Sequence, residues 1–248
     1  MEKKITFEVC CASLDGALNA QMGGADRIEL NCATDLGGLT PSLGLLTECK
    51  AALKIPVLAM VRPRGGGFCY TDNEAKTMYR DAETLLRHGA DGIVFGFLKA
   101  DGTVDSARCK EMLDIIDGST SVFNRAIDTV PGIFDALDAL IESRVKRVLT
   151  SGGRQTALEG AQAINAMMKR AAGRLEILAG GGVRTYNIGE VLKLTGCNQI
   201  HFSCRKRIAD NSTAANPFVR FNASALSENS FYVTDGEGVA EIIKAAKG

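Results

Sequence analysis

Residues 56–70 have the sequence PVLAMVRPRGGGFCY, which is an apolar run followed by a glycine-rich loop. The run from Pro56 to Arg62 predicts a buried strand. Pro63 has no amide hydrogen to donate, so it ends the pairing of that strand, and the three glycines after it allow backbone conformations closed to other residues. A helix predicted over Asp72–His88 completes one strand–loop–helix unit.

The same unit recurs along the whole chain, at a spacing of about 25 to 30 residues. Eight runs predict strands: Ile5–Cys10, Arg27–Asn31, Pro56–Arg62, Gly92–Phe97, Ser121–Asn124, Arg147–Thr150, Arg174–Leu178 and Gln199–Ser203. Strands that alternate with helices favour parallel pairing. Eight such units close into an α/β fold of the (β/α)8 type, the TIM barrel, which we predict as a single domain over residues 1–248.

The alternative to a barrel is an open doubly wound sheet, which normally carries a glycine fingerprint for dinucleotides after its first strand. Here Cys11-Ala12-Ser13 follow that strand, without such glycines. Residues 206–235 interrupt the repeat, because much of this segment is polar and rich in Asn and Ser. We expect an insertion or lid there, before a last helix at Gly238–Ala246.

Composition and charge argue against several classes of protein. The 248 residues are 46% hydrophobic, enough for a large core, and 29 basic residues balance 29 acidic ones. A net charge of zero argues against a general nucleic-acid binder, which carries a basic excess. No apolar run approaches the ~20 residues of a membrane span, and no signal-peptide core follows the N-terminus. The eight scattered cysteines predict reduced thiols.

Charged side chains gather where the predicted strands end, and barrels of this kind have their active sites at the carboxyl ends of the strands. Alternation along a strand directs Glu8 and Glu29 into the barrel. Two buried carboxylates need cations, and Arg62 and Arg125 are the expected partners. Such a group is either a structural ion network or an acid–base pair with shifted pKa values. The candidate catalytic residues are Glu8, Glu29, Arg62, Arg125, Asp128 and His201.

A second group of residues predicts an anion site. Arg62 and Arg64 flank the glycine loop of the third unit, and guanidinium groups bind carboxylate and phosphate well. Barrels often hold phosphate between the loops after strands seven and eight. The alternatives are arginines that only pair with neighbouring carboxylates, and glycines that only permit a tight turn. The expected anion-binding residues are Arg64, Gly180, Gly181, Gly182, Ser203 and Arg205.

Histidine and cysteine supply the candidate metal ligands. His201 lies within the eighth strand, where a lone histidine is either a hydrogen-bonded core residue or a catalytic or ligand group. Cys10 and Cys32 end neighbouring strands, so their thiols could meet, and soft Cu(I) prefers thiolate ligands. No cysteine spacing resembles a closed zinc site. The sequence therefore offers at most a two-thiol copper site, Cys10 with Cys32.

Several long motifs together resemble the CutC family of copper homeostasis proteins, over nearly the whole predicted barrel. They are Phe7-Glu8-Val9-Cys10, Gly23-Gly24-Ala25-Asp26-Arg27-Ile28-Glu29-Leu30, residues 37–42, 62–66, 91–96, 149–152 and 180–183, and the segment around His201. The resemblance implies a TIM barrel, a cytoplasmic location, a homo-oligomer and a link to copper. It implies no particular reaction.

The sequence departs from the family pattern at two positions. The family has Cys directly after the Glu-Leu of strand two, where this chain has Asn31 and places Cys32 one residue later. A shift of one residue turns a side chain to the other face of a strand. This weakens the expectation that Cys32 is a second copper ligand. The family has His before Arg125, where this chain has Asn124, and an amide cannot transfer a proton as His does.

Two functions are therefore expected, one of them being copper binding and handling through Cys10. The other is an enzyme that acts on a small phosphorylated or carboxylated substrate. In that enzyme Arg62 and Arg64 would hold the anion, and Glu8 or Glu29 would be the acid or base. The expected partners are a copper ion, a small anionic ligand and further copies of the chain, with no nucleic acid and no membrane.

Overall fold

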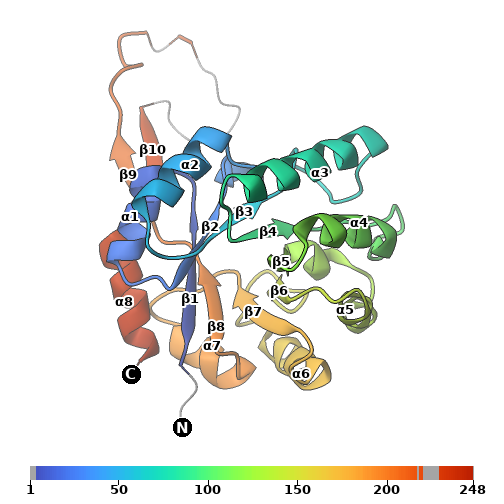
Figure 1. Cartoon of the computed structure of the whole chain (residues 1–248). Coiled ribbons are helices and arrows are strands. Elements are labelled where there is room, and N and C mark those ends of the chain that lie inside the picture. The colour runs from blue at the N-terminus through green and yellow to red at the C-terminus, as the bar shows by residue number, and fades with distance from the viewer. Residues whose placement is uncertain (1–3, 217, 220–228, 248) are drawn as a thin grey trace.

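The strands form a closed parallel barrel surrounded by helices, in a computed structural model that describes residues 4–216, 218–219 and 229–247 (Figure 1). The barrel strands are β1 (Thr6–Cys11), β2 (Arg27–Leu30), β3 (Val57–Met60), β4 (Gly92–Phe95), β5 (Thr120–Phe123), β6 (Arg147–Thr150), β7 (Glu176–Gly180) and β8 (Gln199–Phe202). They pair in sequence order, and β8 closes on β1. The predicted (β/α)8 barrel is thereby confirmed.

A helix follows each barrel strand in the chain. The helices are α1 (Leu14–Met22), α2 (Leu43–Ala52), α3 (Asp72–Arg87), α4 (Ser106–Ile116), α5 (Ile133–Glu142), α6 (Ala161–Ala171), α7 (Ile188–Thr195) and α8 (Gly236–Ala246), with short 3-10 helices η1 (Thr34–Leu36) and η2 (Arg125–Thr129). Polar caps fix the first residue of several helices. At the start of α3 the Thr71 side chain accepts from the Glu74 amide, and the Glu74 side chain accepts from the Thr71 amide. No helix in the described ranges is long and apolar enough to cross a membrane.

The core has two layers because successive side chains of a strand point to opposite faces. Phe7, Val9 and Ile28 point outward into the large cluster between the barrel and its helices. The residues that point inward from β3 to β7 form a separate cluster within the barrel: Leu58, Met60, Val94, Val122, Leu149 and Leu178. The inward positions of β8, β1 and β2 are polar instead, and there the candidate site is built.

The segment at 206–235 contains structure that the sequence pattern did not predict. Strand β9 (Arg205–Ala209) pairs antiparallel with β10 (Ser230–Thr234), beside α1 and at the opposite end of the molecule from the two termini (Figure 1). Asn19 of α1 donates a 2.9 Å hydrogen bond to the carbonyl of Thr234. The part of the expected lid at 217 and 220–228 lies outside the described residues.

Candidate functional site

A cavity of about 320 Å³ lies at the carboxyl ends of the strands, the end where the active site was expected. Cys10, Glu29 and His201 line it from within the barrel, and Tyr232 and Val233 of the hairpin line it from outside. The hairpin β9–β10 therefore forms part of the cavity wall, because it follows directly after β8 and returns over α1. The polar lining side chains come mainly from β8, β1 and β2 and the loops around them.

Glu8 lies behind this cavity in a buried ion group. One of its oxygens is 2.5 Å from Nε of Arg27 and the other is 2.8 Å from Nδ1 of His201. Burial raises the pKa of Glu8, but the hydrogen bond from His201 and the charge of Arg27 outweigh it and lower the pKa to about 2. Glu8 therefore stays ionised, and it does not line the cavity.

The expected cation for Glu8 was wrong: Arg27 holds it, and neither Arg62 nor Arg125 does. Arg27 lies directly opposite Glu8 in the β1–β2 register. The sequence contained a usable signal for this pair. Arg27 is two residues before Glu29, so the alternation that directs Glu29 inward directs Arg27 inward as well.

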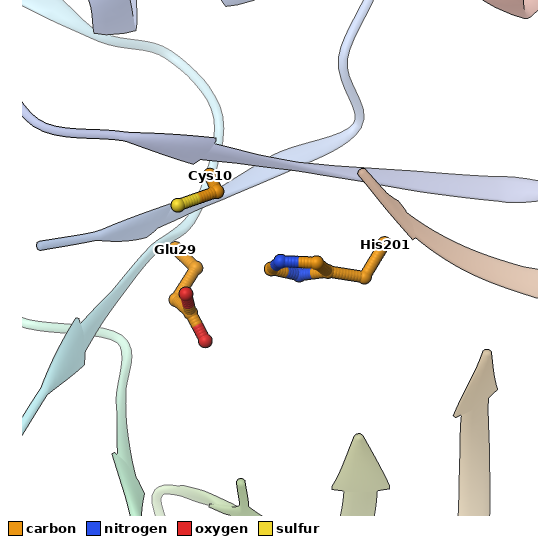
Figure 2. Close-up of side chains that lie close together, drawn as sticks. All are labelled: Cys10, Glu29 and His201. Atoms are coloured by element: carbon orange, nitrogen blue, oxygen red, sulfur yellow. The ribbon is translucent and has the colours of Figure 1, made fainter. Parts of the chain in front are cut away.

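Cys10, Glu29 and His201 form a compact cluster on three adjacent strands. One ligand atom from each lies within 4.8 Å of the others, and the His201 ring is directed toward the other two side chains (Figure 2). Burial raises the pKa of both the Cys10 thiol and the Glu29 carboxyl. Burial lowers the pKa of His201, but the charge of Glu29 and the hydrogen bonds with Cys10 and Glu8 raise it well above its usual value.

Asn31 completes the cluster from the end of β2. Its amide nitrogen donates to Glu29 Oε2 at 2.7 Å and reaches Cys10 Sγ at 3.4 Å. The other carboxylate oxygen, Glu29 Oε1, is buried, as is Asn31 Oδ1, and neither has a hydrogen-bond partner within the described ranges. Asn31 therefore touches two of the three candidate metal ligands, Cys10 and Glu29, and it leaves one carboxylate oxygen uncommitted.

The structure does not bring Cys32 into this cluster, contrary to the expected two-thiol site. Its thiol donates to the carbonyl of Thr40 at 3.0 Å. Cys32 follows Asn31 along the chain, and Asn31 takes the inward direction, so Cys32 turns away from the barrel. Cys10 is the one thiol that lines the cavity among the residues described.

The two arginines of the glycine loop have different roles. Arg62 is buried and lines the cavity, and its guanidinium donates to the carbonyls of Leu36 and Gly66 at 2.8 and 2.6 Å. Arg64 does not line the cavity but pairs with Glu74 of α3 at 2.5 Å. The expectation that Arg64 holds the anion is not met, because the capping glutamate of α3 takes its guanidinium.

The loops after β7 and β8 do reach the cavity. Gly181, Gly182, Ser203 and Arg205 line it, whereas Gly180 is still within β7 and is not part of the lining. Arg205 Nη1 lies 3.1 Å from Thr34 Oγ1, and its guanidinium stacks 5.1 Å from the centre of a tyrosine ring of the hairpin. These four residues thus line one cavity, and their binding of an anion stays a prediction.

Arg125 and Asp128 brace the loops after β5 and β6. Arg125 Nε lies 2.8 Å from Asp128, and the same carboxylate accepts from the Thr150 hydroxyl and the Ser151 amide. Arg125 lines the cavity, but Asp128 does not. Asn124 caps η2, because its side-chain oxygen accepts from the amide of Ala126 at 2.9 Å.

Comparisons with known proteins agree with this architecture. Residues 5–206 match the model of the CutC family. A CutC family protein of Treponema denticola is 48% identical over 98% of this chain and 99% of its own length, and the human copper homeostasis protein cutC homolog is 39% identical over 97% and 89%. A solved CutC structure from Streptococcus agalactiae has a TM-score of 0.76 and 30% identity, over 79% of this chain and 97% of that one.

Proposed function

The chain belongs to the CutC family, and from that premise we propose that it binds and handles copper, as Cu(I), at the thiol of Cys10. One observation carries the proposal: Cys10 faces the cavity next to His201, whereas Cys11 is buried in the outer core. Thiolate and imidazole are both ligands that copper takes in proteins. The human and mouse relatives carry copper homeostasis in their names, which supports the same cargo.

Asn31 makes this a poorer Cu(I) site than one with two thiols, because an amide is a much harder donor than a thiolate. Competition with a Cu(I) chelator, under reducing conditions, tests the proposal. Cys10→Ala is expected to abolish binding, Asn31→Cys to tighten it by about tenfold or more, and the matched control Cys32→Ala to leave it unchanged. Undiminished Cu(I) binding by Cys10→Ala contradicts the proposal.

A second candidate function is an enzyme acting on a small phosphorylated or carboxylated substrate. The composition of the cavity wall favours this function. Glu29, a buried carboxyl with a raised pKa, lines the cavity together with the predicted anion-site residues Gly181, Gly182, Ser203 and Arg205. A buried carboxyl with a raised pKa suits an acid–base role. The test is turnover of small phosphorylated sugars and acids by the native chain and by Glu29→Gln, with loss in the variant expected.

We also propose a cytoplasmic location. All eight cysteines lie in the described part of the chain, and every one is a free thiol. Free thiols persist in reducing compartments. Fractionation of cells that express the chain, with detection by antibody, checks this location.

A further inference from the structure

We propose that Cys10, Glu29 and His201 form an open site for a borderline divalent cation of the Zn²⁺ class. The inference shares Cys10 and His201 with the proposed function, but it names a different metal and a further ligand, Glu29, that Cu(I) does not need. The two can therefore fail separately.

The barrel frame holds the three donors in place. Cys10 lies opposite Glu29 in the β1–β2 register, and His201 lies opposite Glu8 in the β1–β8 register. Their ligand atoms lie within 4.8 Å of one another. Zn²⁺ bonds of about 2.0 to 2.3 Å to N, O and S ligands need separations only somewhat shorter than this limit. Small side-chain rotations, without backbone movement, would bring all three onto one ion.

The histidine is already oriented as in a metal site. His201 Nδ1 is hydrogen-bonded to Glu8 at 2.8 Å, and Glu8 is in turn held by Arg27. A metal-binding histidine usually gives its other ring nitrogen to a carboxylate in this way, which fixes the ring and raises its basicity. Nε2 is then the ring nitrogen that remains for the ion, on the side of Cys10 and Glu29 (Figure 2).

One carboxylate oxygen of Glu29 is free to bind a cation. Glu29 is 3% exposed, and its Oε1 has no hydrogen-bond partner anywhere in the described part of the chain. A buried carboxylate oxygen without a partner is costly, and a cation would remove that cost. Asn31 holds the other oxygen at 2.7 Å and so leaves Oε1 to the ion.

The donor set decides the class of metal. One thiolate and one carboxylate carry the two negative charges that balance a divalent ion, and the mixed S, N and O donors suit Zn²⁺ better than the softer Cu(I). Three protein ligands beside a cavity leave a fourth position for water or substrate, as in catalytic rather than structural zinc sites. The site is thus one that could activate a bound water or polarise a substrate oxygen.

Co²⁺, a spectroscopic substitute for Zn²⁺, tests the proposal on the full chain. We expect one Co²⁺ per chain, with a thiolate-to-metal charge-transfer band that Zn²⁺ abolishes by displacement. Cys10→Ser should lose that band. Glu29→Gln should weaken Co²⁺ binding by about tenfold or more and leave Cu(I) affinity nearly unchanged. The matched control is Glu176→Gln, at the other end of the barrel, which should change neither.

The overturning results are a Co²⁺ spectrum without a thiolate band, or equal Co²⁺ affinity in native chain and Glu29→Gln. X-ray absorption of the Zn²⁺-loaded native chain needs no variant: one sulfur among nitrogen and oxygen neighbours is expected, and a shell without sulfur contradicts the site. If the native chain binds Co²⁺ but not Cu(I), only the proposed function is refuted. If it binds Cu(I) but not Co²⁺, only this inference is refuted.

Discussion

At the scale of single residues, two glutamates at similar depth in one barrel have opposite protonation behaviour. Glu8 is held ionised by Arg27 and His201. Burial raises the pKa of Glu29 by more than the charge of His201 and the hydrogen bond from Asn31 lower it. The difference comes from the neighbouring strands and not from burial, since both side chains are buried. Glu8 serves as a fixed charge, and Glu29 is the group available to a ligand.

Removal of Arg27 is expected to destabilise the protein strongly. Arg27→Met leaves the Glu8 carboxylate buried next to an apolar side chain, and breaking a buried pair in this way costs about 3 to 5 kcal/mol. Denaturant unfolding measures the change. Arg64→Met is the matched control, because its pair with Glu74 is partly exposed and solvent screens it, so its loss should cost much less stability. An equal loss of stability in the two variants would contradict the prediction that the buried Arg27–Glu8 pair contributes more than the exposed one.

Arg205 is expected to bind the anion at the cavity mouth. Titration of the chain with inorganic phosphate should give binding that Arg205→Ala weakens by about 1 to 3 kcal/mol, the range for a hydrogen bond to a charged group. Arg64→Ala serves as a control that should change nothing, since Arg64 does not line the cavity. A crystal soaked in sulfate with no anion near Gly181 and Gly182 would rule this site out.

At the scale of elements, strands β6, β7 and β8 share an ion group at the amino-terminal end of the barrel. Arg147 lies 2.7 Å from Glu176, and Gln199 donates to the same carboxylate at 3.0 Å. Burial raises the pKa of Glu176, but the hydrogen bond from Gln199 and the charge of Arg147 outweigh it and lower the pKa. This group joins the three strands at the end opposite the cavity, so its role is stability.

A pH dependence of stability follows for Glu176. Its pKa is lower in the folded protein than in the unfolded chain, so its stabilising effect is full above the unfolded pKa of about 4.3 and is lost as the pH falls through the folded pKa. The carboxylate is about half exposed, so the effect should not exceed about 1 kcal/mol. The stabilities of native chain and Glu176→Gln, measured by unfolding at several pH values, should differ most at pH 7, and the difference should shrink as the pH falls below the unfolded pKa. A difference that grows at low pH would contradict the assignment.

At the scale of the whole molecule, the cavity needs an open approach from the strand-end face. We expect a homo-oligomer that assembles through the outer helices and leaves this face open. Light scattering coupled to size-exclusion chromatography measures the oligomer, and a crystal structure shows the contact. A monomer at every concentration, or a partner subunit lying over the loop of Arg62 and Arg64, would contradict this prediction.

The sequence alone determined the barrel, because apolar runs and turn residues are local signals that repeat eight times. It also determined which carboxylates face inward, since alternation along a strand is local as well. Glu8 and Glu29 lie inside the barrel as that alternation predicts, and the structure places Cys10 and His201 beside Glu29.

Only the tertiary structure decided which of these groups meet. Residues distant in sequence become partners through strand register: Arg27 and not Arg62 neutralises Glu8, and Glu74 removes Arg64 from the cavity. The hairpin β9–β10 escaped the sequence pattern because it is largely exposed, and an exposed hairpin needs little apolar periodicity. Which side chains become partners depends on which of them lie a few ångströms apart, and they come that close only once the barrel has closed.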